Sequence, residues 1–155
     1  MALIEDFRVQ NYRSLRDVTL GQLEIPLIPL TAVIGKNGSG KSTLFDAFSF
    51  LADCLSIGVE AACNKEHRGG FERLRSQGVN EPISFEVRYR EAHDSEPIYY
   101  ELHIECDNTG HPGVYVEALG YGNLQPGTPN KGMFLYLERG SGRTCATAVP
   151  RIEPC

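Results

Sequence analysis

The segment Gly35–Ser42 reads Gly-Lys-Asn-Gly-Ser-Gly-Lys-Ser and follows the pattern G-x-x-x-x-G-K-[ST]. Its glycines allow a tight turn and let main-chain N–H groups approach a phosphate. The pattern predicts that Lys41 places its charge on the β- and γ-phosphates and that Ser42 offers its hydroxyl to Mg²⁺. The predicted nucleotide-binding residues are Gly35, Lys36, Asn37, Gly38, Ser39, Gly40, Lys41, Ser42 and Thr43.

A phosphate loop of this kind follows a strand and opens a helix, and both neighbours are expected here. Leu30–Ile34 is short, apolar and rich in β-branched residues, which predicts a buried strand. From Leu44 to Leu55 apolar residues recur at helical spacing. The helix N-terminus is therefore expected at Lys41–Thr43, where the helix dipole and free N–H groups favour an anion.

The rest of the chain favours β-structure. Residues 3–10 predict a half-buried strand, Asn11–Asp17 a polar turn and Val18–Leu20 a short strand. After Pro82 the apolar period changes to two, which predicts an antiparallel meander. Its expected strands are Ile83–Tyr89, Ile98–Ile104, Val114–Leu119 and Met133–Leu137, with a hairpin turn at Glu91–Pro97.

Composition sets outer limits on the class of protein. A chain of 155 residues with 41% hydrophobic residues forms one domain or part of one, and the net charge of −5 argues against a broadly basic nucleic-acid surface. The five cysteines form no C-x-x-C pair, which favours free thiols in a reducing cytosol. The acidic start of the chain and the lack of an apolar run near about 20 residues predict a cytoplasmic protein without membrane contact.

Two segments, Phe7–Leu15 and Gly35–Ala47, together resemble the N-terminus of ABC-type ATPases of the RecF/SMC/overcoming-lysogenization-defect group. The closest likeness is to predicted bacterial AAA-family ATPases with a RecF-like head. Lys36 stands where that group often has proline, at a variable position of the pattern. The resemblance implies an α/β fold: the N-terminal lobe of a P-loop NTPase over residues 1–139 with an attached β-meander, followed by an irregular tail at 140–155.

The resemblance also implies a mechanism and partners. Two such heads sandwich two ATP molecules with Mg²⁺, and in the family an arginine or lysine near the position of Arg13 can reach the nucleotide. A head-to-head dimer or a C-terminal ATPase half is the expected partner, with DNA as a further one. The parent protein would hydrolyse ATP in DNA repair or phage defence.

Two parts of such a catalytic site are missing from the sequence. The run Met133–Arg139 ends in a lone glutamate without the preceding aspartate of a Walker B strand, and no Leu-Ser-Gly-Gly-like signature is present. Phosphoryl transfer depends on positioning and charge neutralisation, and half of those parts are absent. The chain is therefore expected to bind ATP without turning it over. A degenerate nucleotide-binding or interaction module and a transport-type ABC subunit remain alternatives.

Several further residues carry weaker signals. Arg13 and Arg16 are either nucleotide contacts or solvated turn charges. The basic stretches His67-Arg68 and Arg73-Leu74-Arg75 either touch a DNA backbone or are solvated loops. Gln77 and Gln125 are candidates for a glutamine that senses the γ-phosphate and Mg²⁺. The four histidines lack metal spacing, and Tyr99 and Tyr100 are expected to pack in the core rather than stack on bases.

Overall fold

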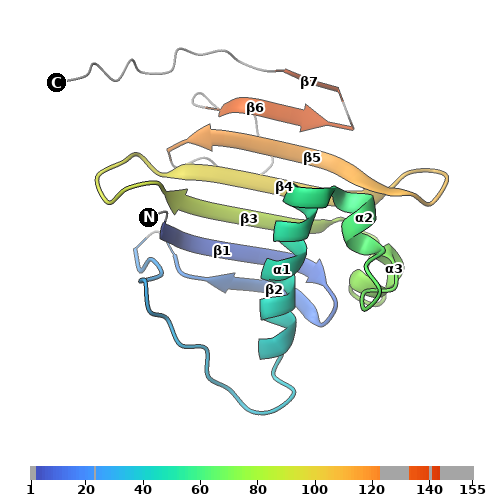
Figure 1. Ribbon diagram of the computed structural model, residues 1–155, viewed down its shortest axis with the longest axis horizontal. Helices are drawn as coiled ribbons and strands as arrows, with labels where there is room; N and C mark the ends of the chain where they lie inside the picture. The colour runs from blue at the N-terminus through green and yellow to red at the C-terminus, as the bar shows by residue number, and fades with distance from the viewer. Residues whose placement is uncertain (1–2, 23, 123–132, 140, 144–155) are drawn as a thin grey trace.

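The computed structural model describes residues 3–22, 24–122, 133–139 and 141–143 of the chain. These residues form two layers: one antiparallel sheet, and a helix that lies across one of its faces (Figure 1). The strands are β1 Leu3–Tyr12, β2 Leu15–Leu20, β3 Ile83–Arg90, β4 Ile98–Cys106, β5 Pro112–Tyr121, β6 Met133–Glu138 and β7 Ser141–Arg143. The helices are α1 Lys41–Ile57, α2 Val59–Cys63 and α3 Phe71–Leu74.

The sheet has the strand order β2-β1-β3-β4-β5-β6-β7, and every neighbouring pair is antiparallel. The order follows from the sequence for β3 to β6, since hairpin connections make successive strands neighbours. The predicted meander is confirmed, including β6 at the expected fourth strand. Its first strand, β3, pairs with β1 from the N-terminus, and this joins the two halves of the chain in one sheet.

Alternation along the central strands decides which face meets the helix. Phe85 of β3 stands opposite Val9 of β1 and Leu102 of β4, and all three belong to the core. On α1 the ring of Phe50 is buried among these side chains, with its centroid 5.9 Å from that of Phe85. The buried residues of α1 recur at helical spacing, so they lie on one side of the helix and cover the apolar face of the sheet.

The turn between the first two strands is much tighter than the sequence suggested. Asn11–Asp17 was expected to be a polar turn, and this prediction is wrong for most of its length. β1 and β2 pair as far as Tyr12 opposite Leu15, so that only Arg13 and Ser14 remain in the turn. Pairing continues because Tyr12 and Leu15 are both buried in the core, which rewards extension of the strands.

The prediction of a buried strand at Leu30–Ile34 is also wrong. Residues 31–36 belong to no helix or strand, and the exposed fractions of Leu30 and Ile34 are 86% and 91%. Composition favours an extended chain here, but a strand becomes stable only with a hydrogen-bonded neighbour and a covered face. Among the described strands none pairs with this segment.

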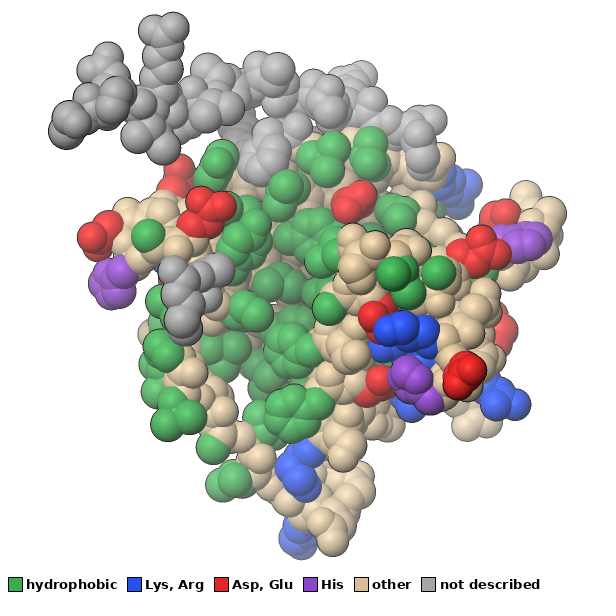
Figure 2. Space-filling view, in the orientation of Figure 1, with side chains coloured by type: hydrophobic (Ala, Val, Ile, Leu, Met, Phe, Trp, Pro, Cys, Tyr) green, Lys and Arg blue, Asp and Glu red, His purple; other side chains and the backbone are tan. Residues whose placement is uncertain are grey.

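Hydrophobic side chains also gather on the sheet face beside α1, where none of the helices in the described residues covers them (Figure 2). Phe45 and Leu55 on the outer side of α1 are each 60% exposed. Together with the segment Leu30–Ile34, they give this side of the molecule an unusual amount of apolar surface for a soluble domain.

The C-terminal tail, expected to be irregular over 140–155, begins with the short strand β7, which pairs with β6. Residues 144–155 lie outside the described part of the chain. Tyr99 and Tyr100 on β4 are buried, which confirms core packing. Within the described residues, no helix combines the length and apolar content needed to cross a bilayer.

Candidate functional site

The loop Gly35–Gly40 leads directly into α1, which begins at Lys41 as predicted. Gly40 adopts the left-handed conformation with φ of 91°, and no side chain of the described residues caps the helix there. The first N–H groups of an uncapped helix lack intrahelical acceptors and, with the helix dipole, attract negative charge. This end of α1 is therefore free to receive an anion.

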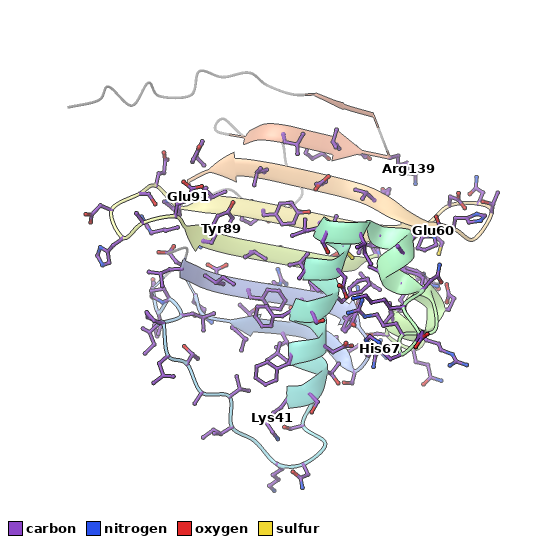
Figure 3. All side chains as sticks on the ribbon, in the orientation of Figure 1. Lys41, Glu60, His67, Tyr89, Glu91 and Arg139 are labelled. Carbon is purple, nitrogen blue, oxygen red and sulfur yellow. The ribbon has the colours of Figure 1, made fainter. Side chains whose placement is uncertain are left out.

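Lys41 closes the loop into a ring. Its Nζ donates to the carbonyl oxygens of Gly35 at 2.6 Å and Lys36 at 2.7 Å, and lies 3.3 Å from Oγ of Ser39. A Cβ on Gly35 would lie 2.8 Å from Ser39 Oγ, so a side chain here would displace the Ser39 hydroxyl from the ring. The ammonium group is thus held at the mouth of the loop, next to the start of α1 (Figure 3).

The turn between β1 and β2 packs against this loop. A Cβ on Gly40 would lie 3.3 Å from Cδ2 of Leu15 and 3.9 Å from Oγ of Ser14. Arg13 in the same turn has a positive φ of 50°, an uncommon conformation for a residue with a Cβ. Two segments that are separated in sequence by about twenty residues therefore meet at the helix N-terminus.

Asp46 links the turn to α1. It lies on the second turn of the helix and accepts a hydrogen bond from the Tyr12 hydroxyl at 2.7 Å. Its Oδ2 also lies 3.2 Å from Nε of Arg13. Burial of the phenol, with the hydrogen bond to Asp46 as a second cause, raises the pKa of Tyr12 well above its usual range. Arg13 is thereby held beside α1 by an ion pair that is mostly shielded from water.

Two further basic side chains approach the same carboxylate from the segment after α2. Nε of Arg68 lies 4.0 Å from Oδ1 of Asp46, and Nε2 of His67 lies 3.9 Å away. His67 is exposed on the side of α1 that faces α3 (Figure 3). Asp46 is thus the common partner of two segments, and sequence reasoning did not identify it. The available signal was a polar residue within the apolar stripe of α1.

The structure corrects the expectation for Arg68. Its side chain is fully buried, so it cannot contact a DNA backbone. Nη1 lies 2.6 Å from Oδ2 of Asp53, and the guanidinium stacks over the ring of Phe50 at 5.1 Å. Lys65, and after it Arg68, lowers the pKa of Asp53. Arg68 is therefore a core ion-pair partner that fastens the α2–α3 segment to α1.

Most of the remaining sequence candidates lie away from the loop Gly35–Ser42. A separate cavity beside the β1–β2 turn is lined by Arg73, Arg75 and Gln77, and Arg16 donates to the Gln77 carbonyl at 2.7 Å. Gln125 lies outside the described residues. Among the described residues no group of three or more His, Cys, Asp or Glu side chains is arranged to hold a metal ion. In the candidate site, Ser42 is exposed at the start of α1.

A comparison with family models gives a match over residues 30–111, which is more than half of the chain. The matching family is described as "AAA domain, putative AbiEii toxin, Type IV TA system". The matched range contains the loop, α1 to α3 and the β3–β4 hairpin. It supports a AAA-type, ATPase-like nucleotide-binding domain. No curated protein matches the chain.

Proposed function

The chain belongs to this AAA-domain family, and we propose that it binds ATP with Mg²⁺ through the loop Gly35–Ser42. One observation carries the proposal: the Lys41 ammonium is held by the carbonyls of Gly35 and Lys36 at the uncapped start of α1. A cation and a row of free N–H groups at one point are the features that a triphosphate requires.

Nucleotide binding would replace the loop carbonyls that accept hydrogen bonds from Lys41. The β- and γ-phosphates take the place of the loop carbonyls as acceptors for Lys41, while N–H groups of the loop and of the first turn of α1 donate to phosphate oxygens. Ser42, exposed on that turn, supplies its hydroxyl to the Mg²⁺ ion. Arg13 reaches the nucleotide from the neighbouring β1–β2 turn, with Asp46 fixing its approach.

The finer assignment is the N-terminal part of a RecF/SMC-like ATPase. It is supported by the β1–β2 turn packing on the loop and by the meander that continues the same sheet. In that assignment a second head or a C-terminal ATPase half supplies the missing acidic residues. The parent activity is ATP hydrolysis in DNA repair or phage defence.

The chain by itself binds ATP without hydrolysing it. β6 ends in Glu138, which follows Leu137 rather than an aspartate, and β6 lies in the meander instead of next to the loop. Glu138 is therefore not placed to bind the metal or orient water at this loop. A nucleotide-binding interaction module without hydrolysis is the second candidate, and the exposed apolar side chains of Leu30 and Ile34 favour it.

Titration of the chain with a fluorescent N-methylanthraniloyl-ATP, with Mg²⁺ or with EDTA, tests the binding site. Lys41→Ala should weaken binding at least about tenfold, which corresponds to about 1.4 kcal/mol. Ser42→Ala should weaken binding only when Mg²⁺ is present. Arg139→Ala is the matched control, because it removes one exposed positive charge far from Lys41 (Figure 3). Equal affinity of the native and Lys41→Ala chains would contradict the proposal.

A phosphate-release assay tests the second half of the proposal. The native chain should release no more phosphate from ATP than the Lys41→Ala chain does. Hydrolysis by the native chain that is lost in Lys41→Ala would show that the chain does not need acidic residues from a partner. The assignment as half of a catalytic site would then be wrong, whereas the proposal of ATP binding would still hold.

A further inference from the structure

A second cluster of positive charge lies outside the phosphate loop. A cavity of about 550 Å³ opens between the β1–β2 turn, α3 and the loop 76–80. Arg13, Arg73 and Arg75 line it, and Glu72 is the one acidic residue among the described residues of its wall. The chain as a whole carries a net charge of −5, so this local excess runs against the average of the molecule.

The two walls of the cavity are fastened to each other by hydrogen bonds. The backbone N–H of Arg13 donates to the Leu74 carbonyl at 2.6 Å, and Ser76 Oγ donates to the Arg13 carbonyl at 2.8 Å. The Ser76 N–H donates to the Asn11 carbonyl at 2.9 Å, and Ser76 is 2% exposed. A pocket with cross-linked walls keeps its shape without a ligand, which lowers the entropy cost of binding.

Arg75 and Arg73 differ in how their side chains are held at the cavity wall. Arg75 is oriented by Glu72, with both carboxylate oxygens 3.0 Å from Nη2, and it stacks over the ring of Phe71 at 5.2 Å. Arg73 is exposed, and its guanidinium makes no hydrogen bond or ion pair with the described part of the chain. A Cβ on Gly69 would lie 2.7 Å from Cδ of Arg73, so the glycine makes room for this side chain.

From this arrangement we propose that the cavity is a second anion site that binds a phosphate group. Guanidinium groups pair with phosphate oxygens through two parallel N–H donors, and Arg73 and Arg75 both line the cavity. The volume lies within the range of about 300–1,000 Å³ that is typical of small-ligand sites. The phosphate comes either from a free phosphate ion or from the 5′-terminal phosphate of a nucleic-acid strand.

The cavity shares Arg13 with the proposed nucleotide site, so its test acts through Arg73 and uses the Lys41→Ala chain, in which the loop lacks its ammonium. Inorganic phosphate is titrated and followed by ³¹P NMR line width. Binding should saturate, weaken about tenfold in the added variant Arg73→Glu and strengthen a few-fold in Glu72→Gln, which releases Arg75. Arg139→Glu is the matched control, because it reverses one exposed charge elsewhere and should change the affinity by less than about twofold.

Anisotropy of a 3′-fluorescein single strand then separates the two sources. Binding about tenfold tighter with a 5′-phosphate than with a 5′-hydroxyl, with the difference lost in Arg73→Glu, identifies a strand terminus. Equal binding of both strands, with saturable inorganic phosphate, identifies a free phosphate ion. The proposal is overturned if inorganic phosphate and the 5′-phosphorylated strand both fail to bind at low salt. Equal losses in Arg73→Glu and Arg139→Glu overturn it as well, since they indicate only the overall field of the protein.

Discussion

The hydroxyl of Tyr12 donates to the carboxylate of Asp46 at 2.7 Å, and this hydrogen bond joins the end of β1 to the second turn of α1. The same carboxylate oxygen lies 3.2 Å from Nε of Arg13. The β1–β2 turn, which packs on the loop Gly35–Gly40, is thus held by α1, the helix that follows this loop. Stability of the fold and geometry of the candidate site depend on one side chain.

Asp46→Ala should lower the free energy of unfolding by about 1–3 kcal/mol, because it leaves the Tyr12 hydroxyl without its acceptor and the Arg13 guanidinium without its nearby carboxylate. Urea denaturation followed by circular dichroism measures the change. Asp94→Ala is the matched control: Asp94 is fully exposed in a hairpin turn and should change stability by no more than about 0.5 kcal/mol. Equal effects of the two substitutions would show that Asp46 does not fasten the turn.

Phe50→Ala should cost about 3–5 kcal/mol, since it empties the centre of the core. The Phe50 ring is 0% exposed and lies between the rings of Tyr12 and Phe85, with centroid distances of 5.3 and 5.9 Å. Phe45→Ala on the same helix is the matched control and should cost less than about 1 kcal/mol, because Phe45 is 60% exposed. Denaturant midpoints of both variants check the difference, and a similar loss in both would place the core elsewhere.

Ile34→Lys should reduce self-association of the chain, because Ile34 is a large apolar residue that is 91% exposed. Sedimentation velocity over a range of concentrations gives the measurement. Thr31→Lys adds the same charge within the same exposed segment and leaves the apolar residues in place. If Thr31→Lys reduces self-association as strongly as Ile34→Lys does, the added charge rather than the loss of apolar surface causes the reduction. A native chain that stays monomeric at high concentration contradicts the prediction directly.

The β4–β5 turn should show a carboxylate that titrates low. Asp107 accepts hydrogen bonds from the Thr109 hydroxyl at 2.6 Å, the Thr109 N–H at 2.8 Å and the His111 N–H at 3.0 Å. These bonds, that of the Thr109 hydroxyl first, lower the pKa of Asp107 from 3.8 to about 2. Because the folded-state pKa is depressed, the stabilisation is fully present above the unfolded-state value and is lost as the pH falls through about 2.

Carboxyl-carbon NMR between pH 1.5 and 5.5 measures that titration. Thr109→Val removes the hydroxyl donor and should move the Asp107 midpoint upward, toward 3.8. A native Asp107 midpoint near 3.8, or one that Thr109→Val leaves unchanged, would contradict the hydrogen-bonded turn.

Local patterns were enough for the elements whose signal is contained in consecutive residues. The start of α1 at Lys41 followed from the loop pattern and from the helical spacing after it. The strands β3 to β6 followed from apolar alternation, because each is paired with its neighbour in the chain. The β1–β2 turn was set too wide, because its limits depend on burial of Tyr12 and Leu15 against distant residues.

The largest discrepancies concern residues whose partners are remote in sequence. Arg68 seemed to be part of an exposed basic stretch with His67, but its partner Asp53 lies on α1. Leu30–Ile34 has the composition of a buried strand, yet among the described strands none pairs with it. The type of a residue sets which environments are favourable for its side chain. Whether that side chain is buried depends on the helices and strands that pack next to it.

The sequence by itself determined the phosphate-loop pattern, the helix that follows it and the meander, since spacing and glycine content impose these locally. Only the tertiary structure decided that the turn carrying Arg13 packs on the loop, that Asp46 holds this turn, and that Arg73 and Arg75 share a cavity with it. Those relationships arise from contacts across many residues of chain, where the free energy comes from burial and charge pairing that no local pattern encodes.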